Sequence, residues 1–192
     1  MILVQITDTH IEEPGDLAYD RFDTAVNLRN AVAAINRMDP GPDMVLHTGD
    51  MAHHGSAERY AYFRELIADL KAPFYAIPGN HDGRAPFRAA FSDTAWMPSD
   101  GAFLHYVVDD FGVRVVCCDS VLEGQTPGGF CAERLAWLDR QLSDVPDKPT
   151  IVALHHPPFG SAMTGTTSNG LIEGGSELAA LIRRHPQVVR VI

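Results

Sequence analysis

Positive charge and long apolar runs are scarce in this sequence. Fifteen Lys and Arg residues stand against 25 Asp and Glu residues, which gives a formal net charge of −10. Since proteins bind nucleic-acid polymers mainly by neutralising phosphates with Lys and Arg, this balance argues against such a partner. No apolar run approaches the roughly 18 residues that span a bilayer, and the chain opens on an apolar strand pattern without a basic leader. We therefore expect a soluble protein with no membrane partner.

Cysteine is scarce as well. The three cysteines are an odd number without the spacing of a disulfide framework, and Cys117 and Cys118 are adjacent inside an apolar run. This pattern favours reduced, buried thiols and hence the cytoplasm. The chain also lacks internal repeats, low-complexity tracts and linkers, while its 45% hydrophobic content is enough for one sizeable core. We expect a single domain over residues 1–192.

Apolar segments of strand and helix period alternate along the chain. The predicted strands, which are rich in Val, Ile, Leu, Tyr or Phe, cover 2–7, 44–48, 73–77, 103–108, 113–118, 150–155 and the start of a last strand at 188–192. The predicted helices begin near 22, 56, 133 and 176, with a short helical or irregular stretch at 85–91. The pattern at 103–118 is typical of an antiparallel hairpin, so we predict an α/β fold with a mixed sheet.

Two of the helical predictions name particular side chains. Ser56 is the expected N-cap of the helix that follows it. The first helix is expected to bury one face, formed by Phe22, Ala25, Val26, Val32, Ile35 and Met38.

Polar residues follow four of the apolar strands. They are Asp8 and His10, then Asp50, then Asn80 and His81, and last His155 and His156. Open α/β sheets place their sites at the carboxyl ends of strands, so we expect these side chains to meet. Carboxylate, imidazole and amide oxygen without thiolate suit Mn, Fe, Zn or Co, so the sequence predicts a metal site.

The spacing of these residues suggests how they would share ions. Asp8 and His10 are two residues apart, so in an extended backbone their side chains point in one direction. Gly49 would let the strand end turn sharply and let an ion approach the backbone. The carboxylate of Asp50 has two oxygens and is able to bridge two ions. The neutral amide of Asn80 would complete the coordination without adding negative charge.

Four ordered motifs carry a resemblance. They are DTH at 8–10, GD at 49–50, GNHD at 79–82 and HHPP at 155–158. In this order they resemble the calcineurin-like metallophosphoesterases, and more closely their class III cyclic-nucleotide phosphodiesterase and glycerophosphodiesterase branch. The resemblance implies a four-layer αββα sandwich of mixed sheets flanked by helices, with two divalent metal ions at the strand ends.

The resemblance also assigns roles to residues. It implies that Asp8 and His10 hold one metal, that Asp50 bridges, and that Asn80 and His155 hold the other metal. His156 would then be a supporting or packing residue, although the reverse assignment of the two histidines stays open.

Further roles concern the phosphate and the supporting residues. His81 matches the family histidine that faces the scissile phosphate, where it would stabilise charge or protonate the leaving alkoxide, the alternative being a structural imidazole. Asp82 is either an orienting partner for such a group or an ordinary loop carboxylate.

The sequence departs from the family pattern in two places. The family's Gly-His-x-His motif, which supplies one histidine to each metal, is not found, and we expect a chain truncated before it, with a naturally shortened form as the alternative. Phosphoprotein phosphatases have Asp-Arg at the third and fourth positions after the aspartate that corresponds to Asp50, and purple acid phosphatases have Tyr at the third of these positions. This chain has His53 and His54 at these two positions. We expect both histidines to be exposed loop residues or part of a substrate pocket. His105 in the hairpin is expected to be structural.

The function implied is hydrolysis of small phosphodiesters, cyclic nucleotides or glycerophosphodiesters, by a hydroxide that two metal ions activate. The alternatives are a phosphomonoesterase and a scaffold that binds metal or phosphate without turnover. Pocket walls are expected at 11–21 and 160–174, and the Gly, Ser and Thr-rich stretch at 160–170 is either a lid or a mobile surface loop. Apolar residues of the hairpin would permit a homo-oligomer.

Overall fold

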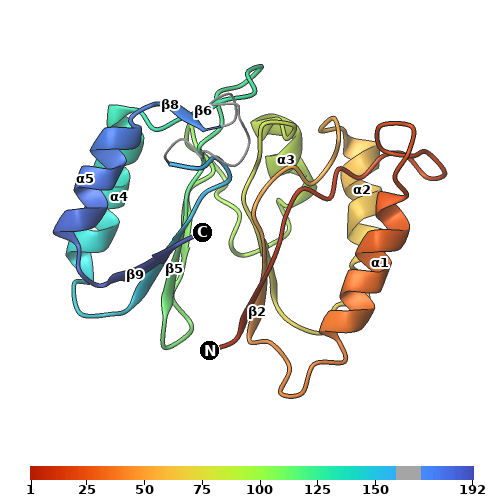
Figure 1. The fold of residues 1–192 in the computed structure, drawn as a ribbon, viewed down its shortest axis with the longest axis horizontal. Helices are drawn as coiled ribbons and strands as arrows, with labels where there is room; N and C mark the ends of the chain where they lie inside the picture. Colours follow the sequence, from red (N-terminus) through yellow and green to blue (C-terminus); the bar gives the residue numbers. More distant parts are fainter. Residues whose placement is uncertain (159–169) are drawn as a thin grey trace.

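The computed structural model describes residues 1–158 and 170–192 and forms four layers (Figure 1). Two sheets face one another in the middle, and helices cover the outer face of each sheet. The predicted αββα sandwich is therefore confirmed. The stretch 159–169, which holds nearly all of the predicted lid or surface loop, lies outside the described residues.

The first sheet is parallel and comes from the amino-terminal half. Its strands, in the order β1, β2 and β3, are Leu3–Ile6, Met44–His47 and Phe74–Ala76. The helices of this half are α1 at Thr24–Ile35, α2 at Ala57–Leu66 and α3 at Arg84–Ala90. All three strands begin at the end of the molecule near the N-terminus, so their carboxyl ends meet at the opposite edge.

The second sheet is mixed. Its strands, in the order β4, β5, β7 and β9, are Tyr106–Val108, Arg114–Cys117, Thr150–Ala153 and Val188–Val191. β4 and β5 are antiparallel, which confirms the hairpin. The helices α4 at Ala132–Asp144 and α5 at Gly175–Arg184 cover its outer face. A short parallel pair, β6 at Gly128–Gly129 with β8 at Leu171–Glu173, was not predicted, because two glycines carry no apolar pattern.

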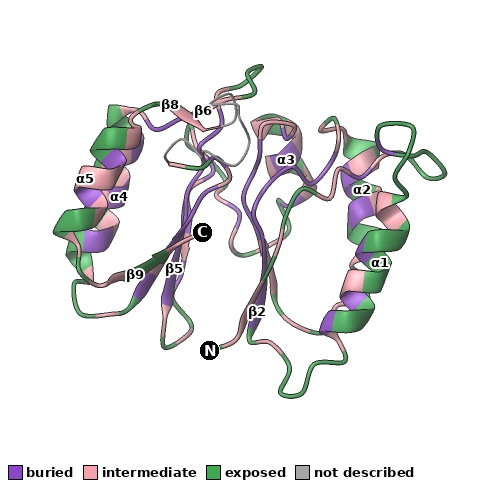
Figure 2. Cartoon of the chain, viewed as in Figure 1, coloured by how far each residue is buried: buried purple, intermediate pink, exposed green. Residues whose placement is uncertain are grey.

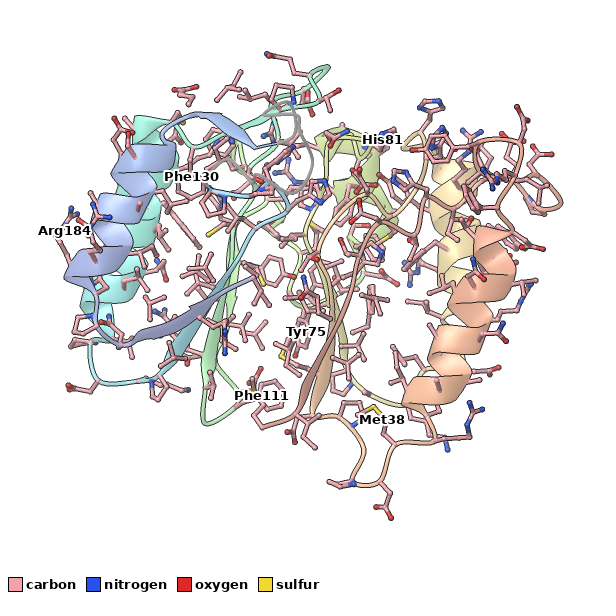
Figure 3. All side chains as sticks on the ribbon, in the orientation of Figure 1. Met38, Tyr75, His81, Phe111, Phe130 and Arg184 are labelled. Carbon is pink, nitrogen blue, oxygen red and sulfur yellow. The ribbon has the colours of Figure 1, made fainter. Side chains whose placement is uncertain are left out.

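The alternation of side chains along β5 divides the core. Val115 and Cys117 pack between the sheets against Met44, while Val116 packs with Leu138 under the helices of the second half. A third cluster lies between the first sheet and its helices. Figure 2 shows the buried residues concentrated along the sheets, and Figure 3 shows Tyr75 and Phe111 in the layer between the sheets.

The predicted buried face of the first helix is partly wrong. Phe22, Val26 and Met38 are 49%, 45% and 40% exposed, because Asp23 caps the helix and Asn36 ends it, which leaves Phe22 and Met38 outside. The buried stripe consists of Leu28, Val32 and Ile35, and Val26 lies about 200° around the helix from Leu28. The Ser56 cap of α2 is confirmed, since its Oγ accepts the N–H of Arg59 at 3.2 Å.

The exposed apolar surface does not lie where the oligomer prediction placed it. None of the exposed large hydrophobic side chains among the described residues belongs to the hairpin at 103–118. Most of the hairpin's apolar residues instead fill the core between the sheets or pack beneath the helices of the second half, and Leu104 packs in the cluster on the first sheet. No helix in the described ranges is long and apolar enough to cross a bilayer.

Candidate metal centre

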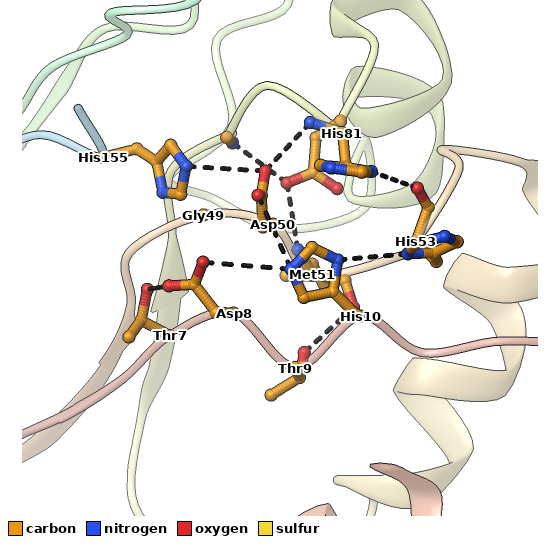
Figure 4. A network of polar contacts seen from close by, with 12 residues as sticks. Thr7, Asp8, Thr9, His10, Gly49, Asp50, Met51, His53, His81 and His155 are labelled. Carbon is orange, nitrogen blue, oxygen red and sulfur yellow. Dashed lines mark hydrogen bonds and ion pairs between the residues drawn. The ribbon is translucent and has the colours of Figure 1, made fainter. Parts of the chain in front are cut away.

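The loops that follow β1 and β2 run side by side and hold one another by backbone hydrogen bonds. The N–H groups of Asp8 and His10 donate to the carbonyls of Gly49 and Asp50, both at 3.0 Å. The N–H of His53 then donates to the carbonyl of Ile11 at 3.1 Å. The parallel pairing of the two strands thus continues beyond their ends and brings the polar residues of both loops together (Figure 4).

The backbone of these loops is left-handed at three candidate ligands. Asp8, His10 and Asp50 have φ of 52°, 42° and 54°. The extended backbone predicted for Asp8 and His10 is therefore wrong. Each such residue costs on the order of 1–3 kcal/mol and persists only where its surroundings fix it, and residues of this kind gather at functional sites.

Asp50 lies between two imidazoles. Its Oδ2 is 3.7 Å from Nε2 of His10, and its Oδ1 is 3.5 Å from Nε2 of His155. The same His10 nitrogen is 3.9 Å from Oδ1 of Asp8. Donor atoms about 2.1 Å from one ion lie roughly 3–3.5 Å apart. The separations here lie at or slightly above that range and exceed ordinary hydrogen-bond lengths, so they suit donors that share an ion better than donors that bond each other. The arrangement fits an ion on either side of Asp50.

Two of the histidines have their proton position set by a carbonyl. Nδ1 of His155 lies 2.8 Å from the carbonyl oxygen of Thr48, which only accepts, so Nδ1 carries the proton and donates it. Nδ1 of His81 donates to the carbonyl of His53 in the same way. In the neutral state both rings therefore leave the lone pair of Nε2 free.

The charge states of Asp50 and His10 suit metal binding. Burial favours the neutral carboxyl of Asp50, but the interaction with His155 and the backbone N–H of His81 outweigh it and lower the pKa of Asp50 to about 2. Burial lowers the pKa of His10 despite the nearby carboxylates. Burial also opposes the charged form of His155, yet the interaction with Asp50 raises its pKa overall. Asp50 and His10 are thus in their ligating forms near neutral pH.

Two glycines allow the close packing around Asp50. A Cβ on Gly49, which has φ of 105°, would lie 2.5 Å from Nδ1 of His155. A Cβ on Gly79 would lie 2.2 Å from Oδ1 of Asp50. The space beside Gly49 that we assigned to an ion is therefore filled by the ring of His155.

Asn80 and His81 lie at the edge of this cluster. The backbone N–H of His81 donates to Oδ1 of Asp50 at 2.9 Å, which holds the GNHD loop against the central carboxylate. No hydrogen bond among residues 1–158 and 170–192 involves the side chain of Asn80. Both residues line a cavity of about 400 Å³ together with His54, Gly124, Gln125 and Thr126.

Asp82 supports the site by joining its loops. It is 1% exposed and accepts hydrogen bonds from the N–H groups of Met51, Ala52 and Gly79 and from the hydroxyl of Tyr60. It is thus neither a partner of the His81 ring nor an ordinary loop carboxylate. The sequence placed it beside the ligands but gave no sign of its four donors, which come from three segments.

His47 is a second supporting residue that the sequence analysis missed. It is fully buried, and burial lowers its pKa to about 3, so it is neutral. Its Nδ1 accepts the N–H of Gly49 at 3.2 Å, which leaves Nε2 to donate to Oγ1 of Thr9 at 2.9 Å. Thr9 in turn donates to the carbonyl of Met51. A histidine inside the apolar run MVLH was the available signal.

The other histidines considered in the sequence analysis lie in different environments. His156 is buried and bonds Oγ of Ser120 and the carbonyl of Thr126, while His155 is the histidine beside Asp50. His105 is structural as expected, since it stacks on Trp137. His54 is exposed as expected. The exposed position expected for His53 is wrong, since its side chain is 16% exposed and contacts His10.

Comparison with known proteins identifies a family, related sequences and a solved structure of similar fold. A family model for the calcineurin-like phosphoesterases matches residues 1–192. A probable glycerophosphodiester phosphodiesterase, GpdQ, of Arcobacter nitrofigilis is 38% identical over 189 residues, covering 98% of this chain and 69% of that protein. The 3',5'-cyclic adenosine monophosphate phosphodiesterase CpdA of Escherichia coli K12 is 29% identical over 186 residues, covering 97% and 66%. A purple acid phosphatase from yellow lupin shares the fold, with a TM-score of 0.61 and 17% identity over 83% of this chain and 31% of that chain.

Proposed function

Because the chain belongs to the calcineurin-like phosphoesterase family, we propose that it hydrolyses small phosphodiesters with the help of two divalent metal ions. The observation that carries the proposal is the position of Asp50, whose two oxygens face the imidazoles of His10 and His155 at 3.7 and 3.5 Å. A carboxylate with one imidazole on each side is the arrangement that a bridging ligand of two ions needs.

The ligands divide into two sets around Asp50. Asp8 and His10 would hold the first ion, and His155 with the amide oxygen of Asn80 would hold the second. These oxygen and imidazole donors, without thiolate, suit Mn, Fe, Zn or Co. When bound, the ions supply Lewis acidity toward phosphate oxygens and a water of lowered pKa.

His81 is the residue proposed to act on the substrate. Its Nδ1 proton is committed to the carbonyl of His53, so Nε2 is the atom that gains or releases a proton. The residue also lines the cavity beside Asn80. A histidine so placed would stabilise negative charge on the phosphate in the transition state or give a proton to the leaving alkoxide.

The substrate class follows from the relatives and from the cavity. The two curated relatives are named for a glycerophosphodiester and for a cyclic nucleotide. The cavity beside Asn80 and His81, of about 400 Å³, has room for a diester of that size. The net charge of −10 disfavours a polymeric nucleic acid. The three free thiols are consistent with the cytoplasm as the compartment.

The test compares a chromogenic phosphodiester, bis(p-nitrophenyl) phosphate, with the matching monoester in the presence of Mn²⁺. We expect faster turnover of the diester, and a fall of roughly tenfold or more in Asn80→Ala, which is the least that loss of a residue supporting a metal site typically costs. Faster turnover of the monoester would make the protein a phosphomonoesterase. Binding of Mn²⁺ without turnover of either ester would make it a scaffold.

A further inference from the structure

The second nitrogen of His10 faces another histidine. Nε2 of His10 points to Asp8 and Asp50, whereas Nδ1 lies 3.4 Å from Nδ1 of His53 (Figure 4). We propose that His53 is a positioning residue: its Nδ1 accepts the Nδ1 proton of His10 and so holds the His10 ring as a metal ligand. The inference rests on the proposed function, because it takes His10 to be a ligand of the first ion.

The proton positions of the two rings follow from this contact. If Nε2 of His10 is the ligating atom, it carries no proton, and the neutral ring has its proton on Nδ1. Among the described residues, the hydrogen-bonding partner of Nδ1 of His10 is Nδ1 of His53, which is then the acceptor. The neutral ring of His53 consequently has its own proton on Nε2.

An acidic side chain faces that second proton. Nε2 of His53 lies 3.8 Å from Oε1 of Glu12, and the other oxygen of Glu12 accepts from Nε of Arg59 at 2.9 Å. The Glu12 side chain is only 12% exposed, and that of Arg59 is 18% exposed. A carboxylate held there by an arginine favours the Nε2–H form of His53, which is the form that accepts from His10.

The backbone places His53 independently of its side chain. Its N–H is bonded to the carbonyl of Ile11, and its carbonyl accepts from Nδ1 of His81. The ring of His53 also stacks on the ring of His81, with centroids 5.1 Å apart and planes at 28°. A substitution at position 53 therefore removes the acceptor for His10 while the backbone bonds to Ile11 and His81 remain.

The effect of this contact would be on metal affinity. An imidazole whose far N–H is bonded to an acceptor is oriented and more basic at its ligating nitrogen, and losing such a partner typically costs about 10–100-fold in metal affinity or activity. We expect His53 to contribute in this way to the ion held by Asp8 and His10.

Three variants distinguish the loss of the hydrogen-bond acceptor at position 53 from the general effect of replacing a histidine. His53→Leu removes the acceptor, and His53→Asn keeps an oxygen near the position of Nδ1. His185→Leu is the control, since that histidine pairs with Asp139 in the second half of the molecule. Mn²⁺ binding is measured by electron paramagnetic resonance of the free ion, with circular dichroism to verify folding. We expect binding of one ion to weaken about 10–100-fold in His53→Leu, and to change much less in His53→Asn and His185→Leu.

Two results would overturn the inference. One is unchanged Mn²⁺ binding in folded His53→Leu. The other is equal weakening in His53→Leu and His53→Asn, which would make the ring of His53 itself a ligand or a packing element. Neither result bears on whether the wild-type chain binds Mn²⁺ and hydrolyses a diester.

A measurement without metal keeps the two proposals separate. The tautomer of His10 is read from ¹H–¹⁵N correlations of the histidine rings in metal-free protein at a pH where the rings are neutral. We expect the Nδ1–H form in the wild type and a shift toward Nε2–H in His53→Leu. Absence of Mn²⁺ binding by the wild type would refute the proposed function, whereas an Nε2–H form in the wild type would refute the inference.

Discussion

The carboxylate of Asp82 offers the sharpest test of how the site is held together. Each of its oxygens accepts two hydrogen bonds, Oδ2 from the N–H groups of Met51 and Gly79, and Oδ1 from Ala52 N–H and the Tyr60 hydroxyl. In Asp82→Asn, the remaining oxygen keeps the two donors on its side if the new NH₂ group takes the place of Oδ1. The NH₂ group then faces the Tyr60 hydroxyl, which is able to turn and accept a hydrogen bond, and the Ala52 N–H, which is not.

The magnitude follows from this count. An orphaned buried N–H costs about 1–3 kcal/mol, and each lost bond to a charged acceptor costs about 1.5–3 kcal/mol. Burial raises the pKa of Asp82, so removal of its charge offsets part of the loss. We expect Asp82→Asn to lower the free energy of unfolding by about 3 kcal/mol, as measured by urea denaturation in the presence of a chelator.

Tyr60→Phe is the matched variant. It removes a single donor and leaves the three backbone N–H groups on Asp82, so we expect a loss of about 1 kcal/mol. A loss below about 1 kcal/mol in Asp82→Asn, or equal losses in the two variants, would refute the assignment of Asp82 as the residue that joins the loops.

Three further predictions concern residues of the centre. The folded-state pKa of Asp50, about 2, lies below its ordinary value of 3.8, so the ionised carboxylate stabilises the protein above pH 4. About 2 kcal/mol of the free energy of unfolding should be lost as the pH falls from 4 to 2. An equal loss in Asp50→Asn over the same pH range would contradict this assignment. Gly49→Ala should destabilise far more than Gly15→Ala, since both have positive φ but only Gly49 has neighbours at the added Cβ; similar melting temperatures for the two variants would exclude the clash. His81→Asn should lower diester turnover about 10²–10⁴-fold with Mn²⁺ binding retained, and loss of binding would make His81 a ligand instead.

Much of the fold was predictable because local patterns and long-range contacts agree. The apolar runs at 2–7 and 44–48 became β1 and β2, and the turn signal in the hairpin at 103–118 gave an antiparallel pair. The first helix shows the limit, since apolar residues at its ends, such as Phe22, lie outside the helix once Asp23 caps it.

The site was predictable in its members but not in its geometry. Asp8, His10, Asp50 and His155 follow apolar strands, and parallel strands bring their carboxyl ends together. The left-handed φ values depend on hydrogen bonds between loops that are about 40 residues apart in the sequence. For the same reason the burial of His53 and the four donors of Asp82 did not follow from the sequence.

The proposed ligands follow strands of both sheets, so bound ions would connect the two halves of the sandwich. Asp50 follows β2 in the first sheet and His155 follows β7 in the second. The side chains packed between the sheets, together with the hydrogen bond from His155 to the carbonyl of Thr48, set the distance between the two ligands. A bound ion would act as a cross-link between the two halves and raise the unfolding free energy by about 2.7 kcal/mol at a hundredfold excess over its dissociation constant. A volume change at Met44 or Val115, which pack between the sheets, would therefore alter metal affinity by changing the distance between Asp50 and His155.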